Sequence, residues 1–371
     1  MAPLEPYEKV LVDEDFLEDD PHGEIACVDC HGGNPEASSF EEAHKGVVKD
    51  PSWPDPAKTC GECHEKIAAV GGSSPHFTLA SFRSVVGARL SDDPHVRKKV
   101  LDEAMGIHCY HCHSSCGACH VSRPEEVEGG LVEGHYFQKT PPMATNCTSC
   151  HGSRVEKEYL GKNKGLPPDV HYAKRGMKCV ACHKGGEMHG TGKTYDYRYK
   201  VENLPKCEDC HKEVLGAKSK VKAHKIHKDK VSCHVCHSVA YKNCYNCHVG
   251  KDAQGLPYFK TEKSELGFKI GLNPLRDSRH PYRFVTLRHV PVNPSIFDYY
   301  VKDAMANFDR LPTWKFATPH NIQRVTPQNK KCSSCHGRKE LFLLEDDVPP
   351  EERAANRAVI VPEDELPKAR R

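Results

Sequence analysis

The sequence predicts a chain of mostly irregular backbone, with short α-helices and very little β-structure, that folds around bound groups. Only 37% of its 371 residues are hydrophobic and 28% are charged, a polar balance for a chain of this length. Glycine and proline contribute 27 residues each, so regular elements should be interrupted often. The third observation is a five-residue pattern, Cys-x-x-Cys-His, which occurs ten times.

We number these copies motifs 1 to 10 in chain order, and together they use all twenty cysteines. The cysteines are Cys27, Cys30, Cys60, Cys63, Cys109, Cys112, Cys116, Cys119, Cys147, Cys150, Cys179, Cys182, Cys207, Cys210, Cys233, Cys236, Cys244, Cys247, Cys332 and Cys335. The histidines that follow them are His31, His64, His113, His120, His151, His183, His211, His237, His248 and His336. No cysteine is left for a disulfide or a free reactive thiol.

This pattern is the attachment site of c-type haem, in which two cysteine sulfurs bond to the haem and the histidine binds the iron. Zinc ribbons and thioredoxin-like motifs also contain Cys-x-x-Cys, but neither requires histidine at the next position. Histidine accounts for 25 of 371 residues, yet it fills that position ten times out of ten. We therefore expect ten c-type haems. Only Ser114 and Ser115 separate motifs 3 and 4, so these two haems should lie close together.

Ten haems leave about 37 residues for each (371/10), and chains of roughly 40 residues rarely build a core without metals or covalent links. We expect the haems themselves to form the core. The polypeptide has a net charge of +2, and each haem adds about −1 when oxidised or −2 when reduced, which gives 2 − 10 = −8 or 2 − 20 = −18. Basic residues are spread among acidic ones, which argues against nucleic-acid binding.

Haem is attached to this motif outside the cytoplasm, so we expect a periplasmic, cell-surface or extracellular protein. The first twenty residues lack the basic and apolar regions of a signal peptide, and we expect that signal to be missing from the given chain. No run approaches the roughly 18 apolar residues of a membrane span. The expected partners are other redox proteins or further copies of the chain.

Motif spacing divides the chain into five parts. They are an acidic arm (1–26), motifs 1 and 2 (27–105), a dense region with motifs 3 to 9 (106–250), an aromatic-rich part without cysteine (251–331), and motif 10 with a C-terminal arm (332–371). The aromatic-rich part either covers haem edges or forms a docking surface or substrate lid.

Several local elements can be assigned. We expect a short helix that begins in motif 2 and ends at Gly71-Gly72. A second helix should have Ser74 as N-cap and Leu79, Phe82, Val86 and Leu90 on one face. Residues 91–99 look like a solvated charged turn. Residues 283–292 should be extended, and 295–308 should form a helix.

The ligand on the second face of each iron decides what a haem does. Histidine lowers the potential, methionine raises it, and an open position permits chemistry. Fifteen histidines (25 − 10) lie outside the motif positions. We set aside His22, His95 and His280, which lie in charged turn-like contexts, and His111 and His234, which lie inside a Cys-x-x-Cys loop.

Ten candidates for the distal ligand remain. They are His44, His76, His108, His135, His171, His189, His224, His227, His289 and His320. Bis-histidine coordination of most or all haems is therefore expected, and a neighbouring chain could supply a distal histidine to a terminal haem. The methionine alternatives are Met105, Met143, Met177, Met188 and Met305.

The ten motifs and the surplus histidines between them resemble the multihaem (decahaem) c-type cytochromes of anaerobic and extracellular respiration, over residues 27–336. The resemblance implies haems in alternating stacked and T-shaped contact. Relatives of this kind include soluble shuttles, subunits of membrane complexes and extracellular filaments. Another branch reduces nitrite, hydroxylamine, sulfite or tetrathionate at one open haem. Its nitrite-reducing members often carry lysine in place of one motif histidine, a replacement that this chain lacks.

The predicted function is electron transfer through ten haems in an anaerobic respiratory or extracellular electron conduit, without a catalytic residue. The alternative is a multihaem reductase of a small oxyanion. In that case basic or phenolic groups of the aromatic-rich part, such as Tyr282, Arg283 and Arg288, would bind the substrate.

Overall fold

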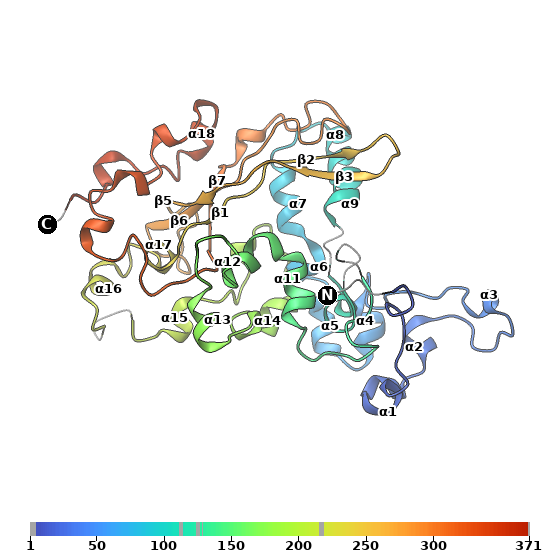
Figure 1. Ribbon diagram of the computed structural model, residues 1–371. Coiled ribbons are helices and arrows are strands. Elements are labelled where there is room, and N and C mark those ends of the chain that lie inside the picture. Colours follow the sequence, from blue (N-terminus) through green and yellow to red (C-terminus); the bar gives the residue numbers. More distant parts are fainter. Residues whose placement is uncertain (1–4, 111–113, 124–126, 128, 215–218, 370–371) are drawn as a thin grey trace. The chain divides into compact units, whose positions relative to one another are not determined.

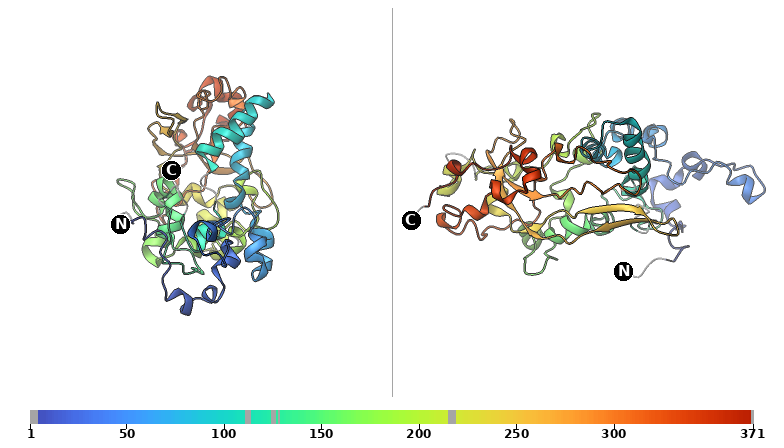
Figure 2. Two further views of the ribbon diagram at one scale, coloured as in Figure 1. Left: turned by 90° about the vertical axis from the view of Figure 1, so that its right-hand side faces the viewer. Right: turned by 90° about the horizontal axis from the view of Figure 1, so that it is seen from above.

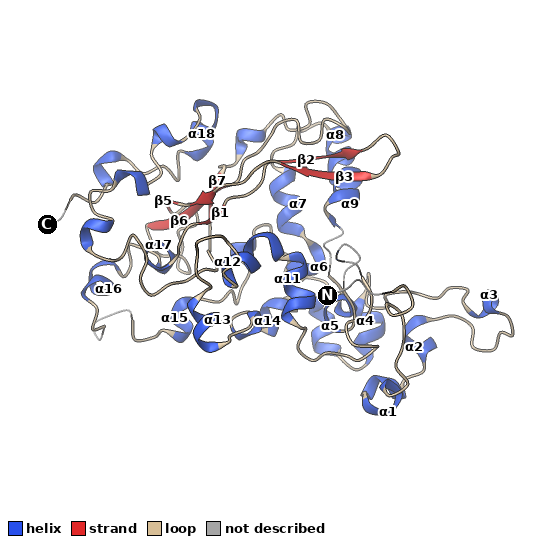
Figure 3. Ribbon diagram, viewed as in Figure 1, coloured by secondary structure: helices blue, strands red, loops and turns tan. Residues whose placement is uncertain are grey.

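The structure is a computed structural model that describes residues 5–110, 114–123, 127, 129–214 and 219–369 (Figure 1). The chain forms two compact units whose segments interleave along the sequence. Unit 1 contains Met1–Ser84, Cys109–His151 and Lys178–Leu204, and unit 2 contains Val85–His108, Gly152–Met177 and Pro205–Arg371. The five-part division by motif spacing stays a prediction. Short helices joined by long loops make up much of both units (Figure 3).

Unit 1 has no β-strand among its described residues. Its α-helices are α1 (Phe16–Asp19), α2 (Cys27–His31), α3 (Phe40–Ala43), α4 (Pro56–Thr59), α5 (Glu65–Gly71), α6 (Pro75–Thr78), α10 (Cys116–His120), α11 (Thr148–Cys150) and α14 (Gly185–Met188), and α7 (Ala80–Gly87) continues into unit 2. 3-10 turns lie at Pro21–Glu24, Cys60–Glu62, Cys179–Ala181 and Arg198–Lys200, and a π-helical turn lies at Met143–Cys147.

The helix end expected at Gly71 and the N-cap expected at Ser74 are confirmed. α5 ends at Gly71, and the Ser74 hydroxyl accepts a hydrogen bond from the backbone N–H of His76 (3.2 Å) at the start of α6. The single helix expected from Ser74 through Leu90 is wrong, because Leu79 adopts a left-handed conformation (φ 48°) that separates α6 from α7. The N-terminal arm contains α1, in which Phe16 is buried.

Unit 2 combines short helices with strands. Its α-helices are α8 (Pro94–Lys98), α9 (Met105–His108), α12 (Lys157–Tyr159), α13 (Val170–Arg175), α15 (Cys207–Cys210), α16 (Lys222–His227), α17 (Cys233–His237) and α18 (Arg353–Asn356). π-helical turns lie at Lys99–Ala104 and Gly152–Glu156, and 3-10 turns at Phe308–Arg310, Cys332–Ser334, Lys339–Leu341, Glu345–Asp347, Pro350–Glu352 and Glu363–Glu365.

The strands of unit 2 form three small antiparallel sheets. They are β1 (Tyr241–Lys242) with β4 (Leu266–Gly267), β2 (Cys247–Lys251) with β3 (Pro257–Thr261), and the three-stranded sheet β5 (Lys269–Leu272), β6 (Phe284–His289) and β7 (Trp314–Phe316). Figure 2 shows β2 and β3 side by side, paired from Cys247↔Thr261 to Lys251↔Pro257.

The three-stranded sheet gives unit 2 an apolar core of its own, which composition alone did not predict. One cluster contains Val285, Leu287, Leu343, Val348 and Val359. A second contains Val235, Ile270, Phe342 and Val361. Ile270 pairs with Thr286, so it lies on the sheet face opposite to that of Val285 and Leu287. Both faces of β6 are therefore covered by apolar side chains.

Three local expectations can be scored in unit 2. The extended segment is confirmed as β6. The helix expected over 295–308 is wrong, because the segment forms successive turns in which Asp303 has a positive φ (54°). The charged turn expected over 91–99 is also wrong: the Asp93 side chain accepts from the His95 N–H (2.8 Å) and caps α8. None of the described helices is long and apolar enough to cross a bilayer.

A matched pair of glycines tests the core of unit 2. A Cβ on Gly271 would stand 2.7 Å from the Val359 carbonyl and would also clash with the Leu287 side chain, whereas a Cβ on Gly267 would meet nothing within 4 Å. Gly271→Ala should therefore destabilise the protein by about 1–3 kcal/mol, and Gly267→Ala should change its stability by about 0.5 kcal/mol or less. Thermal unfolding of both variants measures the difference. Equal melting temperatures would contradict the packing described for β5 and β6.

Candidate metal-binding sites

Most of the motifs fold as a single helical turn. Motifs 1, 4 and 8 form α2, α10 and α17. In motifs 2, 5, 6, 7 and 10 the backbone N–H of the motif histidine donates to the carbonyl of the first cysteine at 2.8–3.0 Å. A helical turn brings residues i, i+3 and i+4 to one face. Both thiols and the imidazole of each motif can therefore reach the same group.

Motifs 3 and 9 differ from this description. His111, Cys112 and His113 lie outside the described residues, so motif 3 and its contact with motif 4 stay predictions. The second half of motif 9 is extended, because Cys247 and His248 belong to β2. Successive side chains of a strand point to opposite faces, so motif 9 does not have the one-sided arrangement of the helical motifs.

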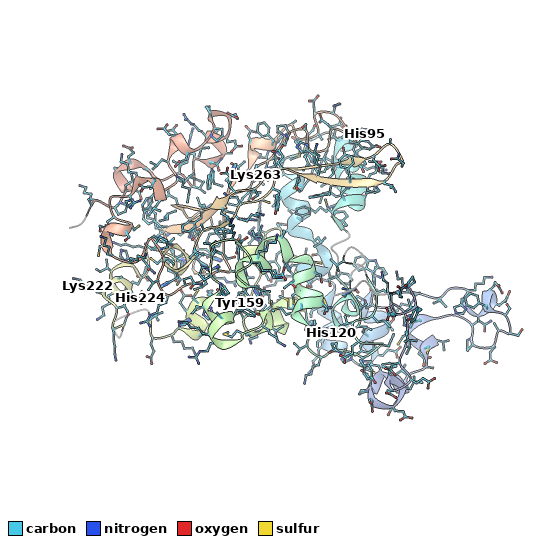
Figure 4. All side chains as sticks on the ribbon, viewed as in Figure 1. His95, His120, Tyr159, Lys222, His224 and Lys263 are labelled. Carbon is cyan, nitrogen blue, oxygen red and sulfur yellow. The ribbon has the colours of Figure 1, made fainter. Side chains whose placement is uncertain are left out.

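Seven motif histidines each face one histidine from outside the motif positions. The pairs are His31 with His135, His64 with His22, His120 with His189, His151 with His76, His211 with His171, His237 with His224, and His336 with His227. Their ring centroids are 5.9 to 6.1 Å apart. Each pair lies within one unit. Figure 4 labels one motif histidine, His120, and one facing histidine, His224 on α16.

This narrow range of distances matches two imidazoles that bind one metal ion from opposite sides. A metal–nitrogen bond is about 2 Å and the ring centroid lies about 1 Å behind the nitrogen, so the two centroids should be about 6 Å apart. Other aromatic contacts of the chain spread more widely, from 3.8 Å for His22 and Phe137 to 6.4 Å for Tyr241 and Phe268. With two thiols on the same turn, these residues fit a haem held by two thioethers and two axial histidines.

The Nδ1 atoms of many of these rings are held by second partners. Nδ1 of His31, His120, His237 and His336 contacts the carbonyls of Val48, Gln138, Gln323 and Lys368 at 2.6–3.2 Å. Among the facing histidines, Nδ1 of His22, His171 and His227 contacts Asp20, Asp169 and the Ala223 carbonyl at 2.8–2.9 Å. A proton donated from Nδ1 leaves the lone pair of a neutral ring on Nε2, which is the atom available to a metal.

Burial also favours the neutral imidazole. It is the largest cause that lowers the pKa of His76, His135, His189 and His224. For His189 and His224 the facing histidine lowers the pKa further. Nδ1 of His135 and of His224 is buried without a hydrogen-bond partner. Neutral imidazoles in partly dry surroundings are suited to bind a metal ion.

Six of the ten distal candidates face a motif histidine: His76, His135, His171, His189, His224 and His227. His22, which the sequence analysis set aside, also faces a motif histidine. Its ring is half-buried, stacks on Phe137 and lies 6.1 Å from the His64 ring, with 23° between the ring planes. The physical reason is Asp20, whose carboxylate accepts from both the backbone N–H (2.9 Å) and the ring of His22.

The remaining candidates have other surroundings. His44 contacts the Phe40 carbonyl through Nδ1 (2.8 Å), and among the described residues no motif histidine faces it. His108 Nε2 lies 2.7 Å from the Tyr300 hydroxyl. The His289 ring lies 5.1 Å from that of Trp314, with no motif histidine facing it in the described part of the chain. The backbone N–H of His320 donates to Glu158 (2.9 Å).

A sequence signal for some facing histidines was available and was missed. Asp20, Ser74 and Asp169 each cap a turn and accept a hydrogen bond from the backbone N–H of the histidine two residues later. These histidines are His22, His76 and His171, and all three face a motif histidine. Asp93 caps α8 in the same way, but its His95 is exposed. The signal therefore predicts the local turn and cannot by itself identify a ligand.

The other proposed site residues are engaged elsewhere. The Tyr282 hydroxyl donates to Glu208, and the Arg283 guanidinium forms an ion pair with Glu365. Arg288 is buried. Of the methionine alternatives, Met105 and Met305 are buried. The half-buried side chain of His234 has its pKa lowered to about 4, with desolvation as the main cause.

No known protein-family model, curated protein or solved structure matches the chain. The function is therefore argued from the motifs and from the geometry of the facing histidines.

Glu158, next to one of the candidate ligands, has an unusual environment. Its side chain is buried, and one carboxylate oxygen accepts from the His320 N–H while the other has no hydrogen-bond partner. Burial raises the pKa of this carboxyl from 4.5 to about 7. A group with a raised pKa in the folded state takes up a proton on folding. Its stabilising contribution is complete below the unfolded pKa and is lost as the pH rises through the folded pKa.

Glu158→Gln should remove this pH dependence. The wild-type protein should lose stability as the pH rises from about 4.5 to above about 7, and the uncharged glutamine should make that loss smaller. Denaturant unfolding across this range measures the change, with the exposed Glu351→Gln as control. A variant with the wild-type pH profile would show that the Glu158 carboxyl is already ionised when the protein folds.

Proposed function

We propose that the chain binds c-type haem at its Cys-x-x-Cys-His motifs and conducts electrons between the haems without bond chemistry of its own. The single observation that carries the proposal is the facing of seven motif histidines by seven other histidines at a uniform distance of 5.9–6.1 Å. A bound haem supplies an iron that gains and loses one electron. The polypeptide supplies the attachment, the axial ligands and the surroundings that set the potential.

Each part of a paired site has a defined role. The two cysteine thiols attach the macrocycle, so its position does not depend on iron ligation alone. The two imidazoles would both hold the iron, so a substrate would have to displace one of them to bind there. Carbonyl and carboxylate partners on Nδ1 make the imidazoles more basic, and this favours the oxidised iron and a low potential. These features suit electron transfer rather than catalysis.

A second function, reduction of a small oxyanion at one open haem, requires an iron with one free face. Among the described motif residues, His248 is a histidine that no described imidazole faces, and its Nε2 lies 3.3 Å from the Asn293 amide. The strand conformation of motif 9 is also the least suited to haem attachment. We therefore place conduction first, and the spectroscopic test below distinguishes the two functions.

The proposal extends to location and partners. Haem attachment at these motifs would take place outside the cytoplasm, in the periplasm, on the cell surface or beyond it. The chain would exchange electrons with other redox proteins or with copies of itself. The multihaem cytochromes of anaerobic and extracellular respiration provide the expected setting.

The haem content of the purified protein tests the proposal directly. Pyridine haemochrome absorbance and intact-mass measurement should give ten covalently bound haems per chain, one for each motif. Nine haems, with free thiols at Cys244 and Cys247, would restrict attachment to the other nine motifs. A chain that carries zinc or disulfides in place of haem would overturn the proposal.

Removal of one facing histidine should leave one iron without its second axial ligand. In His135→Ala or His22→Ala, about one tenth of the iron should change from low spin to high spin, because one of ten irons loses an axial ligand. Low-temperature EPR of the oxidised protein measures this fraction. The exposed His95→Ala is the matched control and should give the wild-type spectrum. A high-spin tenth already present in the wild type would favour the reductase, and an unchanged His22→Ala spectrum would contradict the pairing with His64.

A further inference from the structure

Thiols of different motifs contact each other, and these contacts indicate which haems would be neighbours. The thiols of Cys60 (motif 2) and Cys116 (motif 4) lie close enough to interact, as do those of Cys147 (motif 5) and Cys179 (motif 6). Each contact joins the first cysteines of its two motifs. The edges of two bound haems would therefore lie side by side where these cysteines are attached.

Unit 1 contains two further links. Phe137 lies between the facing histidines of motifs 1 and 2, with its ring centroid 5.7 Å from that of His135 and 3.8 Å from that of His22. Motifs 4 and 5 are joined by Asn146, whose amide donates to the carbonyls of Ala118 (3.3 Å) and Cys119 (2.9 Å). These contacts place motif 1 beside motif 2, and motif 4 beside motif 5.

The link between motifs 5 and 6 has a second support. A cavity of about 130 Å³ is lined by Cys147 and Cys179 together. The His151 ring faces His76, and His183 is near enough to His76 for the two rings to interact electrostatically. Both the thiol side and the imidazole side of motif 5 therefore lie next to motif 6.

Unit 2 shows the same kind of contact. The sulfurs of Cys207 (motif 7) and Cys233 (motif 8) and a Glu208 carboxylate oxygen all lie within 4.8 Å of one another. Cys335 of motif 10 packs against the cluster that contains Val235 of motif 8. The facing histidines of motifs 8 and 10, His224 and His227, are both on α16. Motif 8 thus lies between motifs 7 and 10.

We infer that the bound haems form one run in each unit, in the order of motifs 1–2–4–5–6 in unit 1 and of motifs 7–8–10 in unit 2, with the closest edges at 2/4, 5/6 and 7/8. This inference rests on the proposed function. Electrons then pass between haems that are not consecutive in the sequence. At each step one iron is oxidised from Fe(II) to Fe(III) while its neighbour is reduced from Fe(III) to Fe(II), and no bond forms or breaks. The first electron comes from an external one-electron reductant.

The order can be tested on the haem-loaded protein in two ways. An experimental structure of that protein gives the iron positions. With the iron of motif 3 left out of the comparison, the irons nearest to that of motif 4 should be those of motifs 2 and 5. The second measurement uses a high-spin iron as a magnetic probe. His189→Ala should remove an axial ligand from the iron of motif 4, whose haem has two neighbours in the inferred order. His135→Ala should do the same at motif 1, whose haem has one neighbour.

A high-spin iron speeds the spin relaxation of low-spin haems beside it, so His189→Ala should affect a larger share of the low-spin signal than His135→Ala. The control His95→Ala should affect none. Equal shares, or irons of motifs 2 and 4 that are not adjacent, would overturn the order while leaving electron transfer through haems intact. A protein without covalent haem would instead overturn the proposed function, so the two failures are distinguishable.

Discussion

The pair of imidazoles on either side of a common point is the constraint on which the rest of the structure depends. One member of each pair is fixed by its motif, because it follows directly after the second cysteine. The other comes from a distant stretch, as His135 does for His31 and His76 does for His151. Each pair thus joins two separated segments. This explains why short helices suffice and why both units are assembled from interleaved stretches of chain.

The second partners of the imidazoles explain how these pairs can be held without long elements. A single turn is enough to place a histidine when a capping side chain or a nearby carbonyl fixes its ring. Asp169 shows this most clearly, since one oxygen contacts the backbone and ring of His171 and the other accepts from the Ile322 N–H. The same carboxylate therefore orients a facing histidine and joins two loops of unit 2. Loss of its charge would disturb the ligand and the fold together.

The sequence predicted the motif residues and six of the facing histidines, because a fixed local spacing or a loop position identifies them. His22 was missed because its charged neighbours look like solvent-exposed sequence, whereas Asp20 in fact turns the ring inward. The sheet around β6 was foreseen only as one extended segment, since its partners are far away in the chain. The helix expected over 295–308 failed because apolar spacing did not reveal the turn at Asp303. The periodicity of apolar residues therefore could not predict which distant strands pair or where the backbone leaves a regular helix.

The order of the haems illustrates the same limit in a functional property. Spacing along the chain suggests that consecutive motifs are neighbours, and this holds for motifs 7 and 8, where two cysteines meet through side chains. It does not hold for motifs 2 and 4, whose cysteines are in contact although motif 3 lies between them in sequence. A haem bound by four side chains from two segments would be positioned by tertiary contacts on both faces. The electron route should therefore follow the contacts between the attached cysteines of different motifs rather than the order of the motifs in the sequence. A substitution that moves one haem should slow both electron transfers in which that haem takes part.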